Sequence, residues 1–425
     1  MKEIILGAQF PGVNNFTIWS HPDAGSQIGF DSFRHLAKTL ERGKFDFMFL
    51  AEGLRLREQK GRIYEMDVAG RPNTLAIMAA LAGVTEGLGF IATLSSTFND
   101  PYVLARQLAS FDHLSNGRAG WNVVTSPGPF TGANFRRGDY LPHDQRYDRA
   151  RDFVDAARTL WAAPGRDFDI DLPHAKLKGH FGFPHGDYRP VIAQAGDSSG
   201  GRDFAASHAD VIYSRHGSLA EGQAFYRDIQ TRLGRNGRAP GSLKILPGAH
   251  AILGDTEEEA QHNLREVRLA QVSPRAAIAA LEQTWNRDLS AYDPDGPLPE
   301  VEPDLETKLS LGRTRLHDDV TETVRKWRAL AEAEKLSIRE LVIRVTARKH
   351  FVGTPAQVAA EIDEYVQSDA CDGFVFAPHY VPGGFDSFVD QVIPILQEKG
   401  VFRRDYTEGT LRGNLGLTPA PARAA

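Results

Sequence analysis

The chain has 425 residues, of which 41% are hydrophobic and 24% charged, with a net charge of −6 and one cysteine, Cys371. One cysteine excludes an intramolecular disulfide and a cysteine-based metal cluster, and the lack of a basic run argues against nucleic acid or an anionic membrane as partner. The start MKEIILGAQF has no signal-peptide cleavage site, and no stretch of about 18 apolar residues occurs. A cytoplasmic protein without a membrane span is therefore expected.

Eight short apolar runs alternate with longer amphipathic segments along the chain. The runs are Ile4–Phe10, Phe45–Ala51, Leu88–Leu94, Ala119–Thr125, Val191–Ala195, Val211–Ser214, Leu243–Leu253 and Gly373–Pro378. Each is almost continuously apolar, as expected of parallel strands buried on both faces. Eight βα repeats predict an α/β fold of the (β/α)8 TIM-barrel type. A doubly wound sheet is the alternative, but no G-x-G-x-x-G follows the first run and no Walker A sequence occurs.

Several amphipathic segments carry sequence signals for a helix start. These signals are the pair Asp100-Pro101, the capping-box spacings Ser218–Glu221 and Thr354–Gln357, and the acidic run Glu257-Glu258-Glu259. They predict helices that begin shortly after the third, sixth and seventh runs and before the eighth.

The spacing of the runs is uneven. About 120 residues separate the seventh run from the eighth, and residues from about 271 to 350 are interpreted as the largest insertion on the barrel, with too few strand signals for a sheet of its own. Residues 164–189, rich in His, Gly and Pro, are predicted to form a long loop. We expect one TIM-barrel domain over residues 1–416, followed by a flexible tail at 417–425.

Polar residues gather where the predicted strands end, which is the side of a TIM barrel that carries function. They are mostly hydroxyl, amide and imidazole groups, with few acids and no metal-ligand cluster, which favours a large phosphorylated cofactor. The loop Gly196–Gly201 fits a phosphate, because glycines let the backbone approach a ligand and the following helix offers free N–H groups. An ordinary strand-to-helix turn is the alternative reading of this loop.

The segment Ser115–Ser126, SNGRAGWNVVTS, resembles the signature of the bacterial-luciferase-like flavin monooxygenases. It is most similar to the branch with nitrilotriacetate, dibenzothiophene sulfone and dimethyl sulfide monooxygenases. Further similar stretches follow in the family's order: Gly43–Arg57, Phe98–Leu114, His143–Ala150, Gln194–Asp210 and Val352–Val358.

This resemblance implies a TIM barrel that binds FMN as FMNH2, supplied by a separate NAD(P)H:flavin reductase. In the family, O2 and the reduced flavin form a C4a-(hydro)peroxide that oxygenates a small organic substrate, here expected to contain sulfur or nitrogen. The family also suggests a homodimer or homotetramer. Two other functions stay open: a deazaflavin- or flavin-dependent reductase or dehydrogenase of the same superfamily, and a flavin-binding or light-emitting accessory protein without enzymatic activity.

The resemblance also assigns roles to individual residues. The cofactor-binding set is Glu52, Thr93, Asn122, His143, Tyr147, Ala195, Gly196, Ser198 and Ser199, and the catalytic residue is His143. Thr93 and Asn122 are expected at the flavin ring, and the H-x-x-x-Y pair His143 and Tyr147 beside it. The two serines would bind the phosphate together with the backbone from Ala195 onward.

Each assignment has a simpler structural alternative. Thr93 is also a good strand former, Asn122 can bond a neighbouring strand, and Ser198 can cap a helix. Glu52 stands where many relatives carry Asp, and its longer side chain can instead pair with Arg55 or Arg57. The residue pairs Arg215-His216 and His379-Tyr380 are candidates for the wall of the substrate pocket. No metal is expected, because His174, His180 and His185 are unsuitably spaced.

Overall fold

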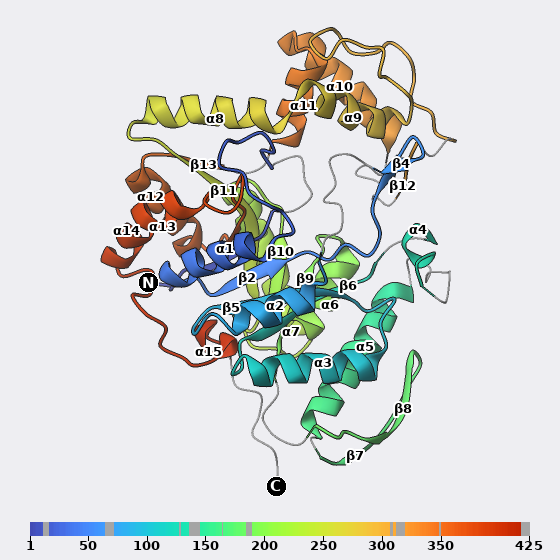
Figure 1. Ribbon diagram of the computed structural model, residues 1–425, viewed down its shortest axis with the longest axis vertical. Coiled ribbons are helices and arrows are strands. Elements are labelled where there is room, and N and C mark those ends of the chain that lie inside the picture. The colour runs from blue at the N-terminus through green and yellow to red at the C-terminus, as the bar shows by residue number, and fades with distance from the viewer. Residues whose placement is uncertain are drawn as a thin grey trace.

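The fold is built around a closed barrel of eight parallel strands (Figure 1). The computed structural model describes residues 1–11, 17–63, 72–126, 129–135, 145–163, 165–183, 189–306, 309–311, 319–347 and 350–417. The barrel strands are β1 (Ile5–Gln9), β2 (Phe47–Leu50), β5 (Gly89–Ser95), β6 (Ala119–Val124), β9 (Val191–Ala195), β10 (Val211–Ser214), β11 (Lys244–Leu253) and β14 (Gly373–Phe376). Strand β14 pairs with both β11 and β1 and so closes the ring. The predicted TIM barrel is confirmed, and each of the eight apolar runs contains one strand.

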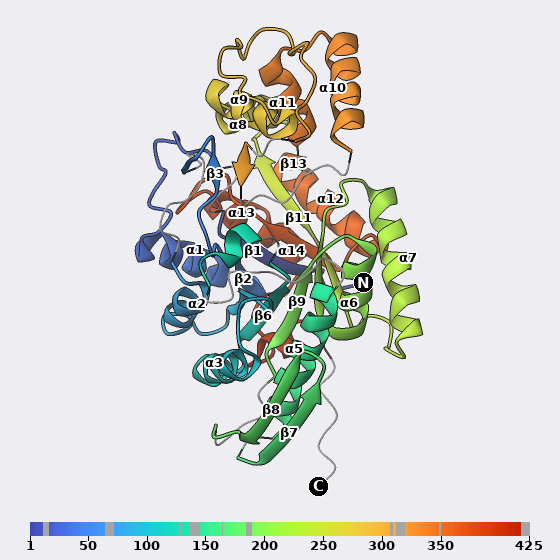
Figure 2. The same ribbon diagram turned by 90° about the vertical axis from the view of Figure 1, so that its right-hand side faces the viewer.

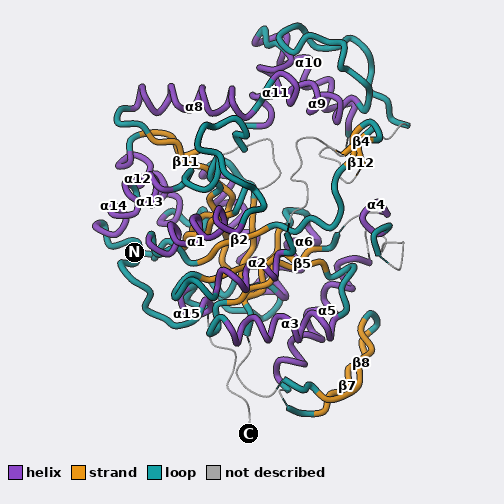
Figure 3. Tube along the Cα trace, in the orientation of Figure 1, coloured by secondary structure: helices purple, strands orange, loops and turns teal. Residues whose placement is uncertain are grey.

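Helices surround this barrel, with the strands gathered at the centre (Figure 3). The outer helices are α1 (Phe30–Arg42), α2 (Thr74–Ala82), α3 (Pro101–Leu114), α5 (Gln145–Ala162), α6 (Ser199–His208), α7 (Leu219–Arg235), α12 (Pro355–Gln367), α13 (Asp386–Gln391) and α14 (Ile393–Glu398), and the short α4 (Pro129–Gly132) lies before α5. Asp100 caps α3, and both capping boxes, at α7 and α12, are formed. The helix starts expected from the sequence are therefore confirmed.

The barrel interior is filled by apolar side chains from alternate strand positions. This cluster contains Ile5, Phe47, Phe49, Ile91, Val191, Ala193, Val211, Leu246 and Val375. Three leucines of the C-terminal segment around α15 (Leu411–Asn414) join it, namely Leu411, Leu415 and Leu417. The Leu411 N–H donates to the carbonyl of Gly117, just before β6 begins. The C-terminal segment thus closes the end of the barrel where the strands begin, and the opposite end forms the mouth.

The long connection from β11 to β14 leaves the barrel along α8 (Glu257–Gln271) and forms a separate helical layer above it (Figure 2). This layer contains α9 (Pro274–Trp285), α10 (Val320–Glu334) and α11 (Ile338–Thr346). They share an apolar core centred on Trp285, Leu281 and Ile338.

Two short strands in this insertion were not expected. Strand β12 (Ser310–Leu311) pairs with β3 (Glu58–Gln59), which forms a hairpin with β4 (Arg62–Ile63). Strand β13 (His350–Gly353) pairs with the outer half of β11. The strands are two and four residues long, too short to show an alternating pattern, and their partners lie far away in the sequence.

The prediction of a long loop at 164–189 is wrong for its described part. Residues Asp167–Leu172 and Ala175–His180 form an antiparallel hairpin, β7 and β8. In β7 the side chains of Phe168 and Ile170 are buried, while Asp167, Asp169 and Asp171, which alternate with them, are exposed. This is the period of two that a strand packed on one face requires. The high content of His, Gly and Pro obscured it in the sequence.

No helix in the described ranges is long and apolar enough to cross a membrane. Of the tail expected at 417–425, only Leu417 is among the described residues, and its side chain is buried.

Candidate active site

Two of the expected flavin contacts lie side by side at the carboxyl ends of β5 and β6. Thr93 and Asn122 are direct neighbours in the strand register, and the Asn122 amide nitrogen donates to the Thr93 hydroxyl at 3.0 Å. Both side chains are buried, and the Asn122 Oδ1 atom has no hydrogen-bond partner among the described residues. An unsatisfied buried acceptor costs about 1–3 kcal/mol. The hydrogen bond to Thr93 on the neighbouring strand therefore uses the amide nitrogen of Asn122. The amide oxygen is left suited to accept a hydrogen bond from a ligand N–H group.

Glu52 lies directly after β2, beside the end of β5. One carboxylate oxygen accepts the Ser95 backbone N–H at 3.1 Å. Burial raises the pKa of Glu52 to about 7, and the Ser95 hydrogen bond offsets part of this rise. The alternative pairing with Arg55 is not formed, because Arg55 bonds Glu58 and the carbonyl of Phe130 instead. The mouth of the barrel thus holds a carboxyl group that titrates near neutral pH.

The loop after β9 brings a tyrosine and several glycines into close contact. A Cβ atom placed on Gly196 would lie 3.2 Å from the Tyr147 hydroxyl, and one on Gly201 would lie 3.1 Å from the same hydroxyl. Tyr147 comes from the first turn of α5, about 50 residues earlier in the chain. The fold therefore gathers Tyr147 and the loop that carries Ser198 and Ser199.

Ser198 is the N-cap of α6, and its hydroxyl oxygen accepts the Gly201 N–H at 3.1 Å. The helix-capping role proposed as the simpler alternative is thus present. It does not conflict with ligand binding, since a serine hydroxyl that accepts one bond can still donate its own proton. Ser199 is the first residue of α6, where the backbone N–H groups have no partner within the helix.

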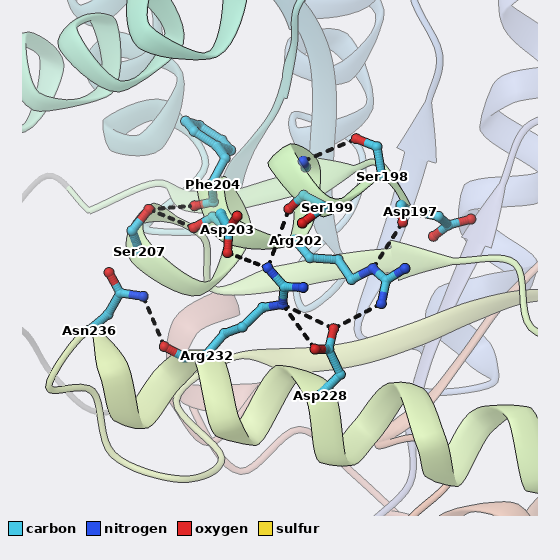
Figure 4. Close-up of polar contacts among 11 residues, drawn as sticks. Asp197, Ser198, Ser199, Arg202, Asp203, Phe204, Ser207, Asp228, Arg232 and Asn236 are labelled. Atoms are coloured by element: carbon cyan, nitrogen blue, oxygen red, sulfur yellow. Dashed lines mark hydrogen bonds and ion pairs between the residues drawn. The ribbon is translucent and has the colours of Figure 1, made fainter.

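A network of arginines and aspartates holds this loop from below (Figure 4). Arg202 donates to the Asp197 carbonyl at 2.9 Å and to Asp228 at 2.8 Å. Arg232 bonds the same Asp228 at 3.0 Å and also pairs with Asp203. These contacts fix the N-terminal turn of α6 against α7, so the loop is held in place before any ligand arrives.

Not every expected contact can be located. His143, the one predicted catalytic residue, lies outside the described residues. Ala195 is the last residue of β9, and Gly196 follows it. Their backbone therefore leads into the loop that carries Ser198. The sequence reading missed Tyr213 on β10, whose ring lies 4.9 Å from that of Phe49 inside the barrel. Its buried hydroxyl oxygen has no partner within the described ranges, and burial raises the pKa of Tyr213 well above its usual value.

Three imidazole rings meet, from His250 on β11, His350 at the start of β13 and His379 shortly after β14. The ring centroids of His250, His350 and His379 are 5.1, 5.1 and 5.8 Å apart. His250 donates from Nδ1 to the Ala377 carbonyl at 2.8 Å, while His379 accepts at Nδ1 from the Gln271 amide at 2.9 Å. The His379 proton is therefore on Nε2. His379 was an expected pocket residue, but the other two could not be found from the sequence, because they come from separate strands.

No group of three or more His, Cys, Asp or Glu side chains in the described ranges could hold a metal ion. His174 bonds Asp152 at 2.9 Å and His180 bonds Asp167 at 3.1 Å, while His185 lies outside those ranges. Arg215, at the end of β10, pairs with Asp197 at 3.0 Å. Burial raises the pKa of the Cys371 thiol, which fits a structural residue.

Taken together, these features define a TIM-barrel protein whose mouth is suited to a large phosphorylated ligand. Comparison with known proteins makes the class specific. Residues 13–370 match the family described as Luciferase-like monooxygenase, and the chain belongs to this family. The enzyme class expected from the resemblance, a flavin-dependent monooxygenase, is thereby confirmed.

Similar proteins span nearly the whole chain. N-acetyl-S-(2-succino)cysteine monooxygenase of Bacillus subtilis (strain 168) is 39% identical, over 98% of this chain and 97% of that protein. Nitrilotriacetate monooxygenase component A of Aminobacter aminovorans is 35% identical, over 98% and 97%. Among solved structures, a riboflavin lyase with modified FMN and riboflavin superposes with a TM-score of 0.79 at 29% identity, covering 98% of this chain and 96% of that one.

Proposed function

We propose that this chain is the oxygenase component of a two-component monooxygenase, with FMN in its reduced form, FMNH2, as cofactor and O2 as co-substrate. The observation that carries the proposal is the unpartnered Asn122 Oδ1 atom at the barrel mouth. Its strand β6 pairs with β9, which leads into the Gly196–Gly201 loop. A flavin has an N–H group on its ring and a phosphate on a flexible chain, so its two ends match these two neighbouring features.

The individual roles follow from this placement. Thr93 and Asn122 would bind the polar edge of the flavin ring, and Glu52 would lie beside it. The hydroxyls of Ser198 and Ser199, with the backbone at Ala195 and Gly196, would hold the phosphate at the start of α6. Tyr147 would pack between these two parts. His143, expected one turn before Tyr147, is proposed as the residue that donates or holds a proton near the ring.

Bound FMNH2 would supply the two electrons with which one oxygen atom of O2 becomes water while the other enters the substrate. The part of the protein is to position the flavin and to keep bulk water out of the mouth. The neutral phenol of Tyr213 and the carboxyl of Glu52 are two polar groups that the barrel holds near this site.

The substrate is proposed to be a small sulfur- or nitrogen-containing compound with carboxylate groups. The two relatives named above act on N-acetyl-S-(2-succino)cysteine and nitrilotriacetate, both of which combine sulfur or nitrogen with several carboxylates. In the barrel, β11 and β14 lie across from β5 and β6. The imidazoles of His250, His350 and His379 would therefore face the flavin from the other side, where imidazole N–H groups can bind a carboxylate.

The electrons for the flavin are proposed to come from a separate NAD(P)H:flavin reductase. The chain has no nicotinamide-binding motif after β1, which supports a separate electron source. One relative is named as component A of its system, which is consistent with such a division. A homodimer or homotetramer is proposed for the oligomeric state.

The test is to mix the protein with FMNH2 without oxygen, admit O2 and follow the return of the absorbance of oxidised FMN. Bound flavin shielded from water should reoxidise at least about tenfold more slowly than free FMNH2. The Asn122→Ala variant should lose most of this protection. Reoxidation at the rate seen in buffer would refute the proposal. N-acetyl-S-(2-succino)cysteine is the first substrate to add, with product formation as the readout.

A further inference from the structure

A pocket of about 550 Å³ lies outside the predicted flavin site, between the β3–β4 hairpin and helix α9 of the insertion. None of the expected flavin contacts that the structure describes lines it. We propose that this pocket is a second small-molecule site, for a ligand that combines an anionic group, an apolar body and an N–H or O–H donor. A pocket of this size suits a small organic molecule, for which about 300–1,000 Å³ is usual.

The donor requirement comes from Gln59, which lines the pocket and is 9% exposed. Its amide nitrogen donates to the carboxylate of Glu282 at 2.6 Å, and its buried Oε1 atom has no partner in the part of the chain that the structure describes. The amide cannot turn over, because the oxygen would then face the carboxylate. Glu282 is itself held by the Leu289 N–H at 2.9 Å and by Lys60 at 2.6 Å. The unpartnered atom is therefore fixed as an acceptor for a ligand.

The apolar requirement comes from the walls. Ile63, Ile278, Pro274 and Tyr292 line the pocket. Ile63 is 55% exposed, one of the few large apolar side chains in the described ranges that face solvent. Covering such a side chain with an apolar ligand removes its contact with water, which favours binding.

The anionic requirement comes from the charges around the opening. Lys60 is balanced by Glu282 and by Asp288, at 2.6 and 2.5 Å. Arg62 also lines the pocket, and within the described ranges it takes part in no ion pair. Its guanidinium can therefore bind a carboxylate or a phosphate, which it matches with two parallel hydrogen bonds.

Two sources could supply this chemistry. FMN carries a phosphate, a large apolar ring and a ring N–H, and the pocket would then hold flavin on its way between a reductase and the barrel. A substrate with a carboxylate, an apolar body and an amide N–H offers the same three features, and the pocket would then hold it before it enters the mouth. The choice between these two sources rests on the proposed function, whereas the proposal of a second site does not. The hairpin follows the proposed flavin site closely in the chain, since Glu58 comes six residues after Glu52.

The experiment is equilibrium dialysis of the full chain with two probes, FMN and N-acetyl-S-(2-succino)cysteine. The variants are Arg62→Glu, which reverses the charge, and Ala279→Trp, which fills the pocket from α9. The control is Arg106→Glu, an exposed position on α3 away from both sites. Ser198→Asp separately weakens the proposed flavin site in the barrel.

If FMN is the ligand, the unmodified chain binds two FMN per chain, and Arg62→Glu weakens one of them at least about tenfold. Ser198→Asp should then keep the pocket-bound FMN and weaken the other. If the substrate is the ligand, Arg62→Glu and Ala279→Trp weaken only the succinocysteine probe. The second site is refuted if neither variant weakens either probe more than Arg106→Glu does. Failure of the proposed function is a different result, namely FMN binding that Ser198→Asp leaves unchanged.

Discussion

At the scale of single residues, Asn122 and Glu52 are the polar groups of the predicted site that the protein alone leaves incompletely satisfied. Within the described ranges, Asn122 keeps a buried oxygen without a partner, and the buried carboxyl group of Glu52 accepts one hydrogen bond, from the Ser95 N–H. The identity and position of both follow from the sequence, since Glu52 directly follows one apolar run and Asn122 lies within another. The sequence does not show that the hydrogen bonding of these two side chains is incomplete, because this depends on which atoms of β5 lie opposite them.

The raised pKa of Glu52 makes the stability of the protein depend on pH. The folded-state value of about 7 lies above the 4.5 of an ordinary glutamate, so the folded protein holds this proton more tightly than the unfolded chain. Glu52 therefore costs no stability below pH 4.5, and the cost grows as the pH rises to about 7. We expect Glu52→Gln, which keeps the bond from Ser95, to raise the free energy of unfolding by about 2–3 kcal/mol above that pH.

Urea unfolding at several pH values measures this difference. Below pH 4.5 the Glu52→Gln variant and the unmodified chain should be equally stable. The exposed Glu398→Gln serves as control and should change stability by less than about 0.5 kcal/mol at each pH. A gain for Glu52→Gln that does not depend on pH would contradict the assigned protonation.

At the scale of elements, the turn from β9 into α6 combines two functions in one serine. Ser198 closes the first turn of the helix and lies at its open N–H groups. The sequence predicts both roles, because a glycine-rich turn before a helix is typical of each. The sequence does not show that Tyr147 is a neighbour of this turn. Tyr147 reaches the turn because α5 packs against α6 on the outside of the barrel. The hairpin β7–β8 is the element that the sequence reading got wrong.

The substitution Ser198→Asp separates the two roles of this serine. Aspartate is as good an N-cap as serine, so the stability of α6 should be retained. Its negative charge should repel the phosphate and weaken FMNH2 binding at least about tenfold. Ser218→Asp, at the N-cap of α7, is the matched control and should leave FMNH2 affinity unchanged. If both variants bind FMNH2 as the unmodified chain does, the phosphate lies elsewhere.

At the scale of the whole molecule, the barrel is closed by residues from both ends of the chain. Strand β1 pairs with β14, and α15 then fills the end where the strands begin. The mouth is thus the one open end, and the insertion above it carries a core of its own around Trp285. The single domain at 1–416 remains a prediction, since an insertion with its own core could also unfold independently.

The closure by α15 predicts a large effect of a small C-terminal change. Leu411→Ala removes a side chain that is 1% exposed and contacts the start of β5, so it should lower the free energy of unfolding by about 2–4 kcal/mol. Leu114→Ala, at a leucine that is 73% exposed, should cost less than about 0.5 kcal/mol. Urea unfolding compares the two. Equal stabilities would mean that α15 does not close the barrel.

The sequence by itself determined the eight strands, the barrel, the capped helices and, through the resemblance, the enzyme class. These features are local patterns: apolar runs, capping spacings and a signature that can be read without knowing which segments meet. The tertiary structure alone decided the contacts between distant segments. It brought Tyr147 to Gly196, gathered three histidines from separate strands, and placed Gln59 against Glu282. Barrel closure produces these contacts, because it joins strands by register and not by nearness in the chain.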